Sequence, residues 1–139
     1  MGGTDTRYSG GCLCGALRWE ADGAPGFAGF CFCADCRRAS GSGFIGFMSF
    51  RSDAISFSGD ARQVRCASIK GSEAVRNRCA TCGSLVFGGM VGVDREHTVY
   101  AGSLDDPSLF APQLAIFVRD KPAWVLLPPG LALFETMPG

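Results

Sequence analysis

The chain has 139 residues, with 13 basic and 13 acidic side chains, one histidine, eight cysteines and 20 glycines. This length predicts a single domain over residues 1–139, and a net charge of zero argues against nucleic acid as the partner, because such binding relies on clustered Lys and Arg. A lone histidine excludes metal sites built on two or three imidazoles. We therefore expect the chemistry of this chain to rest on sulfur.

Short β-strands dominate the predicted elements, because 20 Gly and seven Pro interrupt any long helical periodicity. Two segments are typical of very short helices: residues 34–40, with Gly41 placed to end the helix, and the turn that opens at Asp105-Asp106-Pro107. In chain order, the predicted strands are residues 16–21, 44–50, 54–58, 63–68, 74–78, 84–87, 98–101 and 113–118. The predicted fold class is mainly β, with one or two very short helices.

No segment has the pattern of a targeting signal or a membrane span. Residues 1–10 are polar and glycine-rich, so a secretory signal peptide is not expected, and the longest apolar runs, such as 114–118, are too short to cross a membrane. We expect a soluble cytoplasmic protein with no membrane partner. Trp19 and Trp124 are expected in the core, and the tail from Pro128 is expected to be frayed or laid on the surface.

Seven of the eight cysteines stand in three closely spaced groups, which in a reducing compartment favours metal binding or thiol chemistry. Cys-x-Cys and Cys-x-x-Cys each place two thiolates on one tight turn, close enough to share a zinc ion. The groups are Cys12-x-Cys14, Cys31-x-Cys33-x-x-Cys36 and Cys79-x-x-Cys82.

The first and last groups are each followed by a glycine, Gly15 and Gly83, which permits the turn that points backbone N–H groups at the sulfurs. This shared feature predicts that the two groups combine into one closed structural zinc site. Two disulfides, or four unconnected thiols, are the alternatives. The predicted ligands are Cys12, Cys14, Cys79 and Cys82.

The middle group, Cys31, Cys33 and Cys36, offers three ligands, the number typical of catalytic zinc sites that keep one position open. Three thiolates make such a zinc ion a weak acid towards water but a good host for another thiolate, because the ion lowers the pKa of a bound thiol. The predicted chemistry is activation of a substrate thiol. One alternative is a fourth ligand from Cys66 or His97, which would make the site structural; another is a site often without metal.

If they are not zinc ligands, Cys66 is expected to be a buried inert thiol in an alternating strand, and His97 is expected to be a surface residue near a turn.

Charge is distributed unevenly along the chain. Residues 1–36 carry two basic and four acidic side chains, residues 37–78 carry eight and three, and residues 79–139 carry three and six. The basic middle part follows the three-cysteine group directly, which would favour a small anionic thiol as substrate. We predict that Arg37, Arg38 and Ser42 help to orient it. The remaining arginines of this part are predicted to be solvated on strand faces: Arg51, Arg62, Arg65, Arg76 and Arg78.

Five segments together form a recognisable pattern. They are residues 11–16, which read GCLCGA, residues 31–42, residues 78–85, which read RCATCGSL, residues 101–107, and residues 116–124, which read IFVRDKPAW. In this order, and from about residue 10 to residue 134, the chain resembles the glutathione-dependent formaldehyde-activating enzymes, also called the centromere protein V/Gfa domain family.

The resemblance implies a fold like that of the Mss4 protein, with several short, coiled antiparallel β-sheets stapled by zinc. It implies a structural zinc ion on the first and last cysteine pairs and a catalytic one on the three-cysteine group. We therefore expect two zinc ions per chain, the second of them the more easily lost. The implied activity is that of a carbon-sulfur lyase run backward, in which glutathione and formaldehyde form S-(hydroxymethyl)glutathione.

Many members of the family have His between the first two cysteines of the catalytic group. This chain has Phe32 at that position, which can neither donate a hydrogen bond nor shuttle a proton. A second hypothesis is therefore a non-catalytic, zinc-stapled module that binds a partner protein or a small thiol, because a fold does not fix an activity.

Overall fold

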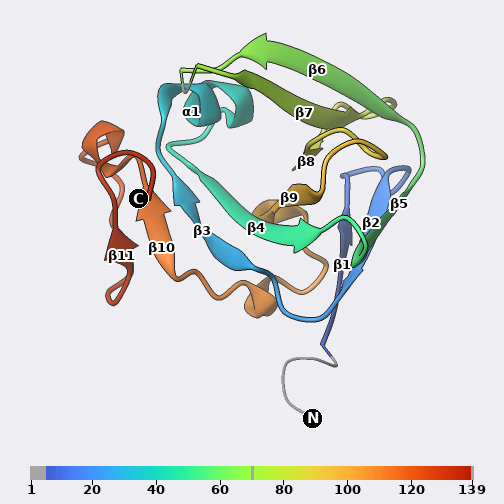
Figure 1. Cartoon of the computed structure of the whole chain (residues 1–139), viewed down its shortest axis with the longest axis horizontal. Coiled ribbons are helices and arrows are strands. Elements are labelled where there is room, and N and C mark those ends of the chain that lie inside the picture. The colour runs from blue at the N-terminus through green and yellow to red at the C-terminus, as the bar shows by residue number, and fades with distance from the viewer. Residues whose placement is uncertain (1–5, 70, 139) are drawn as a thin grey trace.

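The computed structural model describes residues 6–69 and 71–138 (Figure 1). Strands hold 42% of the described residues and helices 12%, which confirms the mainly β class. Within the described residues the strands form two sheets. In the smaller sheet, β2 (Arg18–Asp22) lies between β1 (Arg7–Gly11) and β5 (Ile55–Ser58). The larger sheet has the order β11 (Ala132–Leu133), β10 (Leu114–Ile116), β3 (Phe27–Cys31), β4 (Ile45–Arg51), β9 (Glu96–Tyr100), β8 (Leu85–Gly88), β7 (Glu73–Cys79) and β6 (Ala61–Ala67).

Strand pairing is antiparallel in the smaller sheet and in most of the larger one, as predicted. The exception is β10, which lies parallel to both β3 and β11. The strand β11 belongs to the proline-rich tail, and Phe134 just beyond it donates its backbone N–H to the Ala115 carbonyl at 3.0 Å. The tail is therefore laid on the surface of the domain as a short edge strand.

The helix α1 (Ala34–Ser40) begins and ends where the sequence predicts. Cys33 is its N-cap and accepts a hydrogen bond from the Cys36 N–H, and Gly41 ends it in the left-handed conformation at a φ of 70°. The second predicted helix is a single 3₁₀ turn, η3 (Pro107–Leu109), capped by Asp106. Two more 3₁₀ turns follow β9 and β10: η2 (Ala101–Ser103) and η4 (Val118–Asp120).

None of the helices in residues 6–69 and 71–138 is long and apolar enough to span a bilayer.

The main core lies between the two sheets, because apolar side chains from the inner face of each sheet meet there. On the larger sheet Val99 is paired with Met48 on one side and Phe87 on the other, and all three are buried. On the smaller sheet Trp19 is buried and donates its indole N–H to the Ser103 hydroxyl at 3.0 Å. The prediction for Trp124 is wrong, since its side chain is 75% exposed.

The larger sheet curves strongly, and α1 lies between β3 and the tip of the β6–β7 hairpin (Figure 1). Two hydrogen bonds hold the helix there: the Ile69 N–H donates to the Asp35 carboxylate at 2.9 Å, and Arg78 donates to the Ala39 carbonyl at 3.1 Å. A second apolar cluster, which includes Ile45, packs under the helix on the face away from the main core. This arrangement places the three-cysteine group at the concave face of the sheet.

Candidate metal centres

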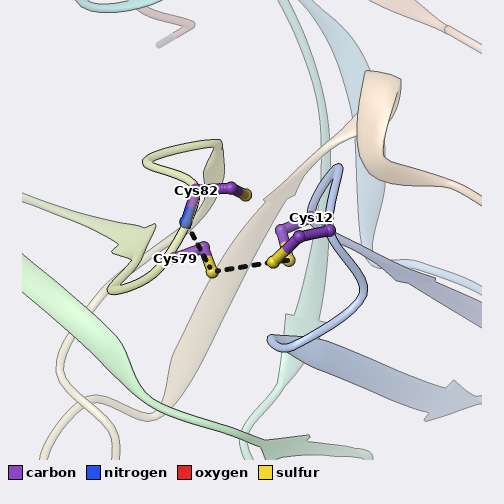
Figure 2. A group of neighbouring side chains, drawn as sticks. Cys12, Cys79 and Cys82 are labelled. Atoms are coloured by element: carbon purple, nitrogen blue, oxygen red, sulfur yellow. Dashed lines mark hydrogen bonds between the residues drawn. The ribbon is translucent and has the colours of Figure 1, made fainter.

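Two loops from different sheets bring the first and last cysteine pairs together (Figure 2). Cys12 and Cys14 lie on the loop after β1, and Cys79 and Cys82 lie at the turn from β7 to β8. All four sulfurs are within 4.8 Å of one another, and Cys14 Sγ is 3.7 Å from both Cys12 Sγ and Cys79 Sγ. Four sulfurs around a tetrahedral zinc ion lie about 3.8 Å apart, whereas a disulfide needs about 2 Å. The geometry therefore fits the predicted ion.

The backbone around this four-cysteine group has the predicted turns. Gly15 and Gly83 have φ values of 83° and 78°, in the left-handed region that glycine tolerates best. Backbone N–H groups then reach the sulfurs: Leu17 donates to Cys12 Sγ at 3.2 Å, and Cys82 donates to Cys79 Sγ at 3.4 Å. Such bonds stabilise thiolate ligands.

Hydrogen bonds also shift the thiol pKa values in this group. The Ser84 hydroxyl and the Ser84 backbone N–H lower the pKa of Cys82 to about 5, and the Leu17 N–H lowers the pKa of Cys12. At Cys14 the Ala16 N–H favours the thiolate, but partial desolvation and the neighbouring thiols outweigh it and raise the pKa to about 11. Cys12 and Cys82 therefore lose their protons more readily than an ordinary thiol, even without a bound metal ion.

The end of β3 and the start of α1 form the second group. Cys31 is the last residue of β3, Cys33 caps the helix, and Cys36 lies in its first turn, with the three sulfurs within 4.8 Å of one another. No further His, Cys, Asp or Glu among the described residues joins them. Neither Cys66 nor His97 supplies a fourth ligand, so the group keeps the three-ligand form that was predicted.

Proximity of the thiols and burial oppose ionisation in this group. Hydrogen bonds with Cys33 and Cys36, followed by burial, raise the pKa of Cys31 well above its usual range. At Cys36 the bond with Cys31 favours the thiolate, but Cys33 and burial raise the pKa overall. Three packed thiols of this kind need a cation to become thiolates together, which is the role of a thiophilic metal ion.

The structure corrects two expectations about isolated residues. Cys66 is exposed, because it lies on β6, the strand at the edge of the larger sheet. His97 is only 2% exposed and lies in the core, with Nδ1 3.1 Å from the Gly88 carbonyl oxygen and its ring against Phe57 and Phe87. Neither residue takes part in the cysteine groups.

The side chain of Phe32 points away from the three-cysteine group. It is fully buried and packs against Phe44, with ring centroids 5.9 Å apart, in a cluster that also contains Ala115 and Val125. Cys31 and Cys33 belong to a different cluster. The Phe32 ring therefore packs in a cluster separate from that of Cys31 and Cys33.

A cleft of about 350 Å³ opens beside Cys31 and Cys36. Its walls are mostly apolar and include Ile45, Phe47 and Ile116, whereas its polar side chains come from the strands β7 and β9. These polar residues are Arg76, Glu96, Thr98 and Tyr100.

Arg76 is the residue of this cleft that the sequence reasoning missed. It is half-buried, within hydrogen-bonding and electrostatic reach of the Cys36 thiol and the Tyr100 hydroxyl. The expectation of a solvated strand face is wrong for this residue. The same expectation fails for Arg78, which is half-buried against α1, and holds for the exposed side chains of Arg51, Arg62 and Arg65.

The three residues expected to orient the substrate lie outside the cleft lining. Arg38 and Ser42 are exposed at the end of α1. Arg37 is half-buried, and its Nε has no hydrogen-bond partner among the described residues. Their role stays a prediction.

A family model described as glutathione-dependent formaldehyde-activating enzyme matches residues 7–120, a range that includes both cysteine groups. The chain belongs to this family. No curated protein matched it. A structural-genomics crystal structure of a Rhodobacter sphaeroides protein is similar in fold, with a TM-score of 0.51, 20% sequence identity, and coverage of 91% of this chain and 98% of that one. The family expected from the sequence is confirmed, and the structural likeness supports the fold.

Proposed function

We propose that this chain is a zinc-dependent carbon-sulfur lyase of the formaldehyde-activating type, which condenses a glutathione-like thiol with a small aldehyde. The observation that best supports this function is a group of three thiols, without a fourth protein ligand in the described residues, at the wall of a cleft. Family membership supports the choice of a glutathione-like thiol and formaldehyde as the class of substrate. The reaction needs a reducing compartment such as the cytoplasm, where free thiols persist.

Cys31, Cys33 and Cys36 would hold the catalytic zinc ion, and the four-cysteine group would hold a structural one. When bound, the catalytic ion would lower the pKa of a substrate thiol and so supply a thiolate nucleophile at neutral pH. The cleft beside it gives the thiol and the aldehyde a shared site, whose mostly apolar walls limit the access of water.

The proposed condensation forms one carbon-sulfur bond, between the thiol sulfur and the aldehyde carbon. The carbonyl π bond breaks, its electron pair moves to oxygen, and that oxygen gains one proton for the one that the thiol loses. Burial raises the pKa of Tyr100 to about 12, so its hydroxyl keeps its proton at neutral pH. We assign Tyr100, on the cleft wall, as the hydrogen-bond donor to the aldehyde oxygen.

Cys33→Ser is expected to remove one of two zinc ions and lower the condensation rate by more than about 100-fold, because the open site loses a ligand. The chain should stay folded, since serine is also a good N-cap for α1. Native mass spectrometry would count the zinc ions, and NMR would follow the glutathione-dependent loss of ¹³C-formaldehyde.

Cys66→Ser is the matched control, because Cys66 is exposed and belongs to neither group. It should keep both ions and full activity. A wild-type protein that holds a single zinc ion and consumes no formaldehyde with glutathione would contradict the proposal and favour the non-catalytic binding module.

Acidification is expected to release metal from the three-cysteine group at a higher pH than from the four-cysteine group. Protons compete with the metal for thiolates, so the raised pKa values of Cys31 and Cys36 weaken metal binding as soon as the pH falls. In the four-cysteine group the pKa of Cys14 is raised as well, but the lowered pKa values of Cys12 and Cys82 keep two thiolates available down to a more acidic pH.

The thiolate-to-cobalt absorbance of a cobalt-substituted protein would report this release as two steps on titration with acid. Cys33→Ser should lack the step at the higher pH. A single step shared by both groups would show that the two sites do not differ in this way.

A further inference from the structure

A glycine, Gly88, lies between Arg76 and Thr98 in the lining of the cleft. In the strand register, Arg76 on β7 is paired with Gly88 on β8, and Gly88 is paired with Thr98 on β9. Gly88 has no side chain, and a Cβ atom there would lie only 3.2 Å from the Tyr100 hydroxyl oxygen. The glycine therefore makes room for the Tyr100 hydroxyl beside Arg76, and the space for a ligand is the cleft that both side chains line.

Arg76 lines the cleft without an ion pair, and its nearest negative influence among the carboxylates is Asp35, which already accepts the Ile69 N–H. The exposed arginines Arg51 and Arg65 pair with Asp53 and Glu73, whereas no carboxylate among the described residues lies within ion-pair distance of Arg76. A guanidinium group has five N–H donors in a planar fork, so contacts with one thiol and one hydroxyl leave donors to spare. A half-buried cation with spare donors favours an anion that can accept two hydrogen bonds.

The acidic residue of the cleft, Glu96, lies at a different part of it from Arg76. The Glu96 carboxylate accepts a hydrogen bond from the Ser49 hydroxyl at 3.3 Å. Glu96 is four residues along β9 from Tyr100, a separation of about 14 Å along an extended strand. Among the charged side chains that line the cleft, Arg76 lies beside Cys36 and Glu96 lies at the other end, so an anionic group of a ligand is favoured at Arg76 over the end near Glu96.

We propose that Arg76 selects the substrate, and that the cleft takes a thiol carrying a carboxylate a few bonds from its sulfur. The inference rests on the proposed function, because the three-cysteine group fixes where the sulfur binds. Arg76 itself reaches Cys36, so an anion bound to its remaining donors lies close to a sulfur held by the metal. The positive charge also offsets the negative charge that a fourth thiolate adds to the three-cysteine zinc site.

Isothermal titration calorimetry of the full-length, zinc-loaded protein tests this selection with 3-mercaptopropionate and 2-mercaptoethanol, which differ mainly in the carboxylate. The wild type is expected to bind 3-mercaptopropionate at least about tenfold more tightly, the usual effect of a charged hydrogen bond. Arg76→Gln should reduce this preference to within about twofold, and Arg76→Lys should keep part of it. Arg62→Gln is the matched control, because Arg62 is exposed on β6 and outside the cleft lining.

Glutathione and its glycine ethyl ester provide a second comparison in the wild type, where the free acid should bind more tightly. Cobalt absorbance of each variant shows whether both metal sites are intact. Equal binding of acid and ester, or of the two small thiols, by the wild type would overturn the inference, as would an Arg76→Gln protein that keeps the preference. Each of these results leaves the proposed function standing, whereas a metal-loaded protein that binds no thiol at all would overturn both.

Discussion

Cys82→Ser is expected to lower the free energy of unfolding of the zinc-loaded protein by on the order of 4 kcal/mol, far more than Cys33→Ser. The four-cysteine group joins the loop after β1 to the turn after β7, and Cys14 and Cys79 are 65 residues apart in the chain. These loops belong to different sheets, so the ion would hold the two sheets together. The three-cysteine group joins only β3 to the helix that follows it, and its loss leaves the two sheets in place.

Urea denaturation followed by tryptophan fluorescence would measure the difference, because Trp19 lies in the core between the sheets. A strong chelator added to the wild type should reproduce the effect of Cys82→Ser, and Cys66→Ser should have no effect. Equal destabilisation by Cys33→Ser and Cys82→Ser would show that the two groups do not divide into a structural and a catalytic site.

The local features of both metal centres could be predicted because they depend on near neighbours in sequence. The ligand spacing, the left-handed turns at Gly15 and Gly83, and the ends of α1 at Cys33 and Gly41 each involve a few consecutive residues. Backbone geometry and capping rules act over the same short range. The pairing of the first and last cysteine groups followed from two such local similarities.

Strand β3 was missed because its sequence, FAGFC, lacks the alternation of a half-buried strand. The strand is covered on both faces, with Ala28 in the main core and Cys31 in the second cluster. Gly29 provides the close approach of β10, since a Cβ atom there would overlap the Leu114 carbonyl oxygen. A glycine that weakens a strand prediction is in this case what allows the parallel pairing.

Burial of single polar residues could be predicted only in part. His97 alternates with Glu96 and Thr98 and shares a face with Val99, so a strand starting at residue 96 would have placed it inside. Arg76 gives no such signal. Its side chain faces the cleft that the curvature of the larger sheet creates, and curvature of that kind is a property of all its strands together.

Gly59→Ala is expected to be among the most damaging substitutions of a single glycine, with a loss of more than about 3 kcal/mol of stability and weaker metal binding at the four-cysteine group. Gly59 lies between β5 and β6 with a φ of 96°, a conformation that costs an alanine about 1–2 kcal/mol. An added Cβ atom would also overlap the carbonyl oxygen of Ala16. Ala16 follows Cys14 and Gly15 directly, so the displaced backbone belongs to the loop that supplies two of the four thiolates.

Substitutions of two further glycines separate the cost of the positive φ from the cost of the steric overlap. Gly92→Ala has the same kind of positive φ, 83°, with no atom within 4 Å of the new methyl group, and Gly102→Ala has neither problem. Urea denaturation should rank Gly102→Ala as nearly neutral, Gly92→Ala at about 1 kcal/mol, and Gly59→Ala well beyond it. A Gly59→Ala protein no less stable than Gly92→Ala would show that the overlap is relieved without cost. One that loses stability but keeps its cobalt affinity would show that the β5–β6 turn moves and the cysteine loop does not.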